Sequence, residues 1–208
     1  EIGACDWSSD VCSSDLTYQR WFDLGAHRYL LRIESANPKL YNSIHPDDHD
    51  FERRVKCLKD LREIGYQVGT GVMIGIPGQS TEDLIDDILF FAQHNVDMIG
   101  MGPYVIHEET PIVEEIKDKD KLKERNLEWG LKMVAILRVV MPDINIAATT
   151  ALQALDPIGR EKALKAGANI LMPVVTHQNY RADYQLYQDK PCIDEEPSDC
   201  KNCLAYRI

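Results

Sequence analysis

The sequence predicts an α/β fold in which parallel strands alternate with helices. Short, nearly continuous apolar runs alternate with longer segments that carry an apolar stripe at helical spacing. Strands that are apolar along their whole length are typical of a parallel sheet covered on both faces. The order fits either an open doubly wound sheet or part of a (β/α)8 barrel. In both folds the chemistry lies at the carboxyl ends of the strands.

Five apolar runs are the predicted strands, and turn-forming or helix-capping residues follow them. The runs are 28–34, 68–76, 97–102, 144–148 and 169–172. Within the first run, Arg32 and Glu34 lie two positions apart. They therefore project from the same face of the strand.

Helical spacing predicts the segments that connect these strands. They are the end of a helix at 17–25, a short helix at 38–44, a helix that starts at Phe51, and helices at 81–94, 121–140 and 157–166. Asp50 and Ser80 are predicted N-caps, and Ser80 forms a Ser-x-x-Asp pattern with Asp83. Gly25 and Gly167 are predicted to end the helices that precede them.

Composition narrows the possible functions. The net charge of −11 over 208 residues disfavours a general nucleic-acid binder. No apolar run approaches the ~20 residues that span a bilayer, and the N-terminus lacks the basic and apolar parts of a secretory signal. Six cysteines, three of which cluster near the C-terminus, favour metal binding in a reducing compartment over a disulfide scaffold. We therefore expect a cytoplasmic protein with no membrane or nucleic-acid partner.

The chain is expected to divide into three parts. Residues 1–16 have no hydrophobic period, and Asp6 to Leu16 read as the translation of a common sequencing-adapter oligonucleotide. We treat this segment as non-native and exclude it from the fold, as is done for other foreign segments. Residues 17–173 carry the strand–helix pattern, with a loop at 103–120 that is long enough to be functional. Residues 174–208 have an irregular pattern and form a C-terminal extension.

The second predicted strand carries glycines throughout and runs into Pro77-Gly78. Buried strands accept so much glycine where a ligand or another backbone comes close. Ligand contact at the carboxyl end of this strand is one interpretation, and a tightly packed barrel strand beside a turn is the other. A phosphate-binding P-loop is excluded, because no Gly-Lys-Ser/Thr follows.

Polar residues at the predicted strand ends are candidates for binding. Arg32 and Glu34 could bind the carboxylate and the ammonium or ribose groups of an amino-acid-like ligand; alternatively, they pair with each other. Arg54, at a helix start, could hold a carboxylate or could be a solvated arginine. Thr149 and Thr150 could donate to an anion or could simply form a turn.

The C-terminal extension carries the strongest metal signal. Cys192-x7-Cys200-x2-Cys203 supplies three thiolates, which suits an iron–sulfur cluster with one open iron. Zinc would need a fourth ligand, for which His177 is the nearby candidate, and three unligated thiols are the remaining alternative. Tyr180, which precedes these cysteines, begins a spacing of three phenols that packing explains more readily than catalysis.

Several segments together resemble the HydE family, the radical S-adenosylmethionine (SAM) maturases of [FeFe]-hydrogenases in the biotin-synthase-like group. The resemblance covers roughly residues 17–203, far more than one motif. The matching segments are 28–38, 69–79, 101–104, 148–151, 167–173, 180–181 and 184–187.

The resemblance implies a (β/α)8 barrel that binds SAM at its carboxyl face, next to a [4Fe–4S] cluster, and acts with other hydrogenase maturation proteins on a small molecule or an iron complex. It implies that the SAM-binding residues are Glu34, Arg54, Met73, Ile74 and Gly75. It implies that the substrate- or anion-facing residues are Arg32, Thr149, Thr150, Met172, Tyr184 and Tyr187. It implies that the ligands of an accessory iron–sulfur cluster are Cys192, Cys200 and Cys203.

One departure from the family pattern decides what we expect of this chain. The family holds its catalytic cluster with Cys-x3-Cys-x2-Cys after the first strand, and this sequence contains no such motif. The match begins just before the fourth barrel strand. We therefore expect strands four to eight of a barrel from a longer protein that generates a 5′-deoxyadenosyl radical, and we expect the chain alone to be inactive.

Two alternatives remain open at this point. Another enzyme of the same group, such as a methylornithine synthase or a biotin synthase, would share the barrel and SAM. A protein of another class, an iron–sulfur carrier or scaffold without catalysis, would use only the cysteines of the extension.

Overall fold

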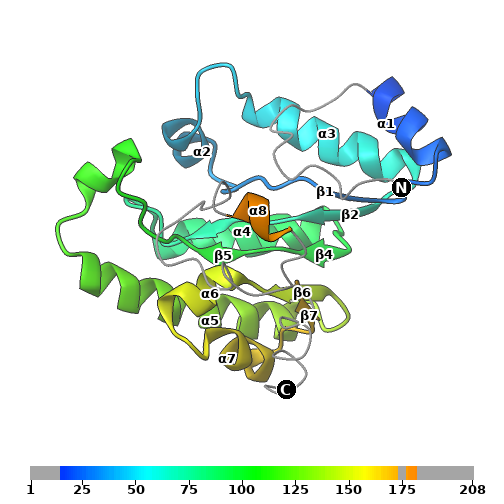
Figure 1. The fold of residues 1–208 in the computed structure, drawn as a ribbon. Helices are drawn as coiled ribbons and strands as arrows, with labels where there is room; N and C mark the ends of the chain where they lie inside the picture. Colours follow the sequence, from blue (N-terminus) through cyan, green and yellow to red (C-terminus); the bar gives the residue numbers. More distant parts are fainter. Residues whose placement is uncertain (1–14, 173–176, 182–208) are drawn as a thin grey trace.

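A five-stranded parallel sheet forms the centre of the structure, a computed structural model that describes residues 15–172 and 177–181 (Figure 1). Its strands are β1 (Arg28–Leu30), β2 (Gln67–Thr70), β4 (Met98–Ile99), β6 (Asn145–Ala148) and β7 (Ile170–Leu171). They are paired in the order β1-β2-β4-β6-β7, which is also their order along the chain. A doubly wound sheet reverses its strand order at a switch point, whereas a barrel does not. The structure therefore confirms the α/β prediction and favours an arc of a (β/α)8 barrel.

A second pair of parallel strands extends the sheet toward its carboxyl edge. β3 (Met73–Ile74) pairs with β5 (Gly102–Pro103) in the register Met73↔Gly102. Each lies just beyond β2 or β4, after a short interruption at residues 71–72 or 100–101. The chain after β1 also stays in register as far as Glu34, which bridges Val72. Three consecutive strand ends thus lie side by side at this edge.

The helices lie close to where their apolar stripes predict them. They are α1 (Asp15–Asp23), α2 (Pro38–Ile44), α3 (Phe51–Ile64), α4 (Thr81–Gln93), α5 (Lys119–Val140), α6 (Thr150–Leu155), α7 (Gly159–Ala166) and α8 (Gln178–Arg181). The predicted caps are confirmed, since Asp50 accepts from Glu52 and Arg53, and Ser80 and Asp83 form a reciprocal capping box. Such side chains satisfy backbone groups that a helix end leaves open.

Besides shifts at the ends of several elements, three differences from the prediction stand out. Helix α6 is missing from it, because six residues between a strand and Asp156-Pro157 give too few turns for a periodic signal. The predicted loop at 103–120 contains a 3-10 helix, Pro111–Glu115, and the first residues of α5. Helix α1 starts at Asp15, two residues inside the segment that we excluded as non-native.

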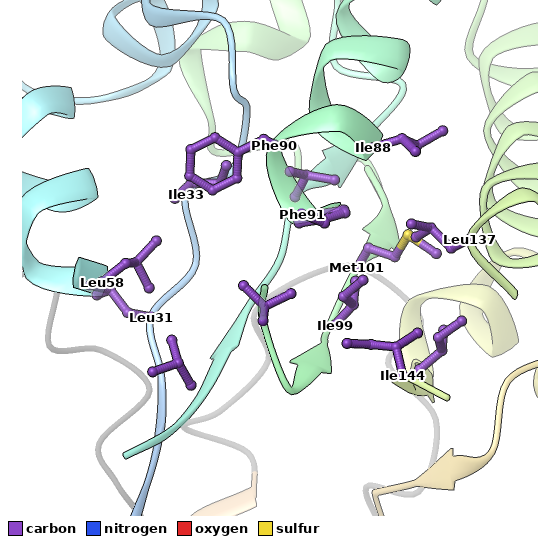
Figure 2. Packing of buried hydrophobic residues seen from close by; sticks show 14 of the residues in the cluster. Leu31, Ile33, Leu58, Ile88, Phe90, Phe91, Ile99, Met101, Leu137 and Ile144 are labelled. Atoms are coloured by element: carbon purple, nitrogen blue, oxygen red, sulfur yellow. The ribbon is translucent and has the colours of Figure 1, made fainter. Parts of the chain in front are cut away.

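The hydrophobic core lies between the sheet and the crossover helices. Figure 2 shows Leu58, Phe91 and Leu137, from α3, α4 and α5, lying around Ile33, just beyond β1, and Ile99 of β4. Ile33, Phe91, Ile99 and Leu137 are fully buried. Burying side chains of this size contributes about 1.5–3 kcal/mol each. The core therefore fixes where each strand ends, and with it the positions of the polar residues at the carboxyl edge.

Candidate functional site at the carboxyl ends of the strands

Arg32 and Glu34 form a bidentate ion pair just beyond β1. Arg32 Nε lies 2.7 Å from Glu34 Oε1, and Arg32 Nη2 lies 2.9 Å from Glu34 Oε2. The guanidinium also donates to two neighbouring strands, to the carbonyl oxygens of Gly100 at 2.5 Å and Val72 at 2.8 Å. Parallel bonds of this kind fix the orientation of a carboxylate as well as its position. The prediction that both side chains share one face is confirmed, and within the structure they pair with each other.

The electrostatics of the pair favour the charged form of Arg32. Burial disfavours the charged Arg32 guanidinium, but the adjacent Glu34 carboxylate outweighs this effect, so the pKa of Arg32 is raised. The two side chains remain 29% and 19% exposed. The Glu34 carboxylate is therefore held in one orientation by Arg32, and part of its side chain remains exposed.

The backbone of Glu34 adopts an unusual conformation. Its φ is +56°, in the left-handed region that residues other than glycine rarely adopt. Three backbone hydrogen bonds hold it there: Glu34 N–H donates to Gly71 O at 3.1 Å, Met73 N–H donates to Glu34 O at 2.9 Å, and Ser35 N–H donates to Ile33 O at 2.6 Å. Such strain costs about 1–3 kcal/mol and occurs most often at functional sites. This backbone geometry makes Glu34 a candidate functional residue.

Arg54 lies behind this pair, on α3. It is only 4% exposed, so the interpretation of a solvated arginine is wrong. Its Nη1 donates to the carbonyl oxygen of Arg32 at 3.0 Å, and its guanidinium lies 5.8 Å from the centre of the Tyr41 ring. His45 stacks on the same ring, and burial lowers its pKa, with the Arg54 charge adding to that lowering. Arg54 therefore supports the strand backbone from which Arg32 projects.

The glycine-rich turn after β3 is closed by a side chain that the sequence did not indicate. Gln79 Oε1 accepts from Gly75 N at 2.5 Å and from Ile76 N at 3.3 Å, while its Nε2 donates to Met73 O at 3.2 Å. Gly75 has a φ of +82°. Glycine is the residue that adopts this conformation without steric cost.

The glycines of this strand are explained by close approach within the chain. A Cβ on Gly71 would lie 2.0 Å from the carbonyl oxygen of Gly100, and one on Gly75 would lie 1.9 Å from Asn126 Oδ1. The interpretation of a tightly packed barrel strand thus accounts for both positions. Ile74 is fully buried, and both backbone polar groups of Gly75 accept or donate within the chain. Of the three predicted SAM-binding residues here, Met73 is the one with an incompletely buried side chain.

Asn126 joins two strand ends from the buried face of α5. Its Nδ2 donates to Gly75 O at 3.2 Å and to Tyr104 O at 3.0 Å, and the residue is fully buried. The sequence does carry a signal for Asn126, because this polar residue lies on the buried stripe of α5, in line with Gly130, Met133 and Leu137. The same signal points to Asp83 and Asp87 on α4.

Asn126→Ala should lower the free energy of unfolding by about 2 kcal/mol, because it leaves the Tyr104 carbonyl without this donor. Glu128→Ala is the matched control on the same helix. Glu128 is exposed and pairs with exposed Lys132, so we expect a loss below about 0.5 kcal/mol. Urea unfolding followed by circular dichroism measures both. Equal stability of the two variants would contradict a role for Asn126 as a cross-link.

Three further predicted residues, Thr149, Thr150 and Met172, lie on the other side of the same edge. Thr149 follows β6 and is 8% exposed, and within the described residues its hydroxyl has no hydrogen-bond partner. A Cβ on Gly102 would lie 2.9 Å from that hydroxyl, so Thr149 faces the end of β5. Thr150 begins α6, and Met172 directly follows β7. Tyr184, Tyr187, Cys192, Cys200 and Cys203 lie outside the described residues.

The structure therefore brings Glu34, Met73, Gly102 and Thr149 to neighbouring positions along one edge. Within residues 15–172 and 177–181, no group of three or more histidine, cysteine, aspartate or glutamate side chains is arranged to hold a metal ion. No helix in the described part of the chain is both long and apolar enough to cross a membrane.

Comparisons with known proteins agree on one family. Residues 8–91 match the model of the radical SAM superfamily, a match that begins inside the segment interpreted as non-native. The chain is 46% identical over 191 residues to the [FeFe] hydrogenase maturase subunit HydE of Thermotoga maritima, covering 92% of this chain and 53% of that protein. It is 28% identical to 3-methylornithine synthase of Methanosarcina acetivorans, over 84% of this chain and 47% of that protein.

A solved structure matches the fold. The crystal structure of methylornithine synthase superimposes with a TM-score of 0.71 at 24% identity, covering 94% of this chain and 55% of that one. The chain thus spans about half the length of each of these relatives.

Proposed function

The chain belongs to the radical SAM superfamily and is HydE-like, and on this premise we propose that it forms the SAM-binding half of an [FeFe]-hydrogenase maturase. The observation that supports the proposal is the Arg32–Glu34 ion pair, which presents a fixed, partly exposed carboxylate at the carboxyl ends of adjacent strands. In barrels of this class, ligands bind at that edge. The parent enzyme would act with other maturation proteins on a small molecule or an iron complex.

The proposed roles follow from the geometry. The Glu34 carboxylate would accept hydrogen bonds from hydroxyl or ammonium groups of SAM, while Arg32 keeps that carboxylate in one orientation. Arg54 would support the Arg32 backbone, and Met73 would offer apolar contact. Thr149 and Thr150, across the edge, would face the substrate. In the complete enzyme SAM would supply radical chemistry, and the residues described here would bind and orient it.

A catalytic [4Fe–4S] cluster does not fit the residues present. The sequence contains no Cys-x3-Cys-x2-Cys, and we therefore derive no electron-transfer step. For Cys192, Cys200 and Cys203 we propose an accessory iron–sulfur cluster. Iron and sulfide analysis of the purified chain tests it, since zinc without sulfide, or no metal after reconstitution, would remove that assignment.

The purified chain should bind isotopically labelled SAM in equilibrium dialysis, and Glu34→Gln should weaken binding by about tenfold, because it removes one charge-assisted hydrogen-bond acceptor. Glu128→Gln, at an exposed position on α5, should bind as the unmodified chain does. Absence of SAM binding, or equal affinity of the Glu34 variant, would refute the proposal. Methylornithine formed from lysine by the full-length enzyme would instead support the related synthase.

A further inference from the structure

The short segment 34–37, here called the arch, connects the end of β1 to α2 and carries Glu34. Two carboxylates of α4 accept hydrogen bonds from the arch. The Ala36 amide donates to Asp87 Oδ1 at 2.6 Å, and Asn37 Nδ2 donates to Asp83 Oδ1 at 2.6 Å. Asp83 is itself fixed, because its Oδ2 accepts from the amide and hydroxyl of Ser80. The arch is thus tied to α4 directly beyond the residue with left-handed backbone.

Asp87 is the unusual member of this arrangement. It is fully buried, and its Oδ2 has no hydrogen-bond partner within the described residues. In that part of the chain no arginine, lysine or histidine forms an ion pair with it. The charged groups that act on it are Asp83 and Asp86 on its own helix and Glu34 on the arch, all of them acidic. Burial, followed by these charges, raises the pKa of Asp87 to about 7, against the Ala36 hydrogen bond.

A buried carboxylate in such surroundings costs stability. An asparagine could accept from the Ala36 amide without a charge, so packing alone does not explain the aspartate. What the charge adds is a stronger bond, since charge-assisted hydrogen bonds are about twice as strong as neutral ones. That bond acts on the arch two residues from Glu34.

We propose that Asp87 is a positioning residue that holds the arch, and through it the Glu34 carboxylate, in the geometry for ligand binding. The bond to Ala36 favours the ionised form of Asp87. Protonation of Asp87, while its side chain stays buried, therefore weakens this bond, so the arch loosens as the pH falls through neutrality. The part of this inference that concerns ligand binding rests on the proposed function. The clamp on the arch itself does not.

Hydrogen–deuterium exchange of the full 208-residue chain tests the clamp. After correction for the intrinsic pH dependence, peptides that cover 34–37 should exchange about fivefold faster at pH 6 than at pH 8, the effect of losing about 1 kcal/mol from one hydrogen bond. Asp87→Asn should exchange at pH 8 as the unmodified chain does at pH 6. Asp86→Asn, the exposed neighbour on the same helix, should keep the pH dependence but move it to lower pH, because it removes one of the charges that raise the pKa of Asp87.

Glu34→Gln gives a further arm, because removal of its negative charge should move the transition to lower pH. A corrected exchange rate that does not vary between pH 6 and pH 8 would overturn the clamp, as would an Asp86 variant that behaves like the Asp87 variant. If the exchange results hold but the chain binds no SAM, the proposed function fails and the clamp stands. If SAM binds and Glu34→Gln weakens it while Asp87→Asn changes neither exchange nor affinity, the clamp fails alone.

Discussion

Replacing Arg32 with methionine should lower the free energy of unfolding by about 3 kcal/mol. The change leaves the Glu34 carboxylate without its cation and removes donors from the carbonyl oxygens of Gly100 and Val72. Removing one partner of a buried ion pair costs about 3–5 kcal/mol, and the lower end applies because both side chains remain partly exposed. Methionine keeps the length and apolar volume of the stem, so the loss reports on the polar contacts.

A double-mutant cycle separates the ion pair from the carbonyl contacts. Glu34→Gln in the Arg32→Met background should cost less than the sum of the two single changes, by about 1 kcal/mol or more. Arg20→Met, at an exposed site on α1, is the control and should stay within about 0.5 kcal/mol of the unmodified chain. Urea unfolding gives all four values. Strict additivity would show that the two side chains do not stabilise each other.

Asp87→Asn should stabilise the chain at pH 8 and have little effect near pH 4. The folded chain holds the Asp87 proton up to about pH 7, whereas an unfolded aspartate releases it near pH 3.9. Between these values the folded state binds more protons, so stability falls as the pH rises. Three pKa units correspond to about 4 kcal/mol at most. Because asparagine does not titrate, the gain from the substitution should grow across this window and level off above pH 7.

Urea unfolding of the unmodified chain and of the Asp87→Asn variant at several pH values from 4 to 8 measures this gain. The contributions of the other titrating groups cancel in the difference between the two free energies of unfolding. Asp86→Asn serves as the matched control, since Asp86 is exposed on the same helix, and it should show a much smaller difference, because it lowers the pKa of Asp87 without removing the titrating carboxyl. A constant difference for the Asp87 variant would mean that Asp87 is already ionised near pH 4 in the folded state.

Local patterns in the sequence predict the order of the elements well. Alternating apolar runs predict the parallel strands, and Asp50 and Ser80 mark helix starts, because these signals depend on neighbours within a few residues. Helix α6 is not predicted in this way, because its six residues are too few to show a helical periodicity. The strand order then follows from the requirement that consecutive parallel strands be joined by crossover helices.

The contacts within the candidate site depend on residues far apart in the sequence. The position of Arg32 and Glu34 on one face follows from strand alternation, but whether they bind each other or a ligand does not. The sequence correctly places Arg54 at the start of a helix. Its burial, however, depends on how α3 packs against the chain at Arg32, to whose carbonyl oxygen Arg54 donates. The glycines were recognised as unusual, but the atoms that approach them belong to Gly100 and Asn126, 29 and 51 positions away from Gly71 and Gly75.

The amide of Asn126 has a mechanical consequence for the site. Its two N–H groups lie in one rigid plane, and each donates to the end of a different strand, at Gly75 and Tyr104. This planar group therefore fixes the spacing between these ends together with the pairing of β3 with β5. We expect that a ligand that displaces one strand end also displaces the Asn126 amide and, through it, the other strand end. Two contacts made along this edge should consequently strengthen or weaken together.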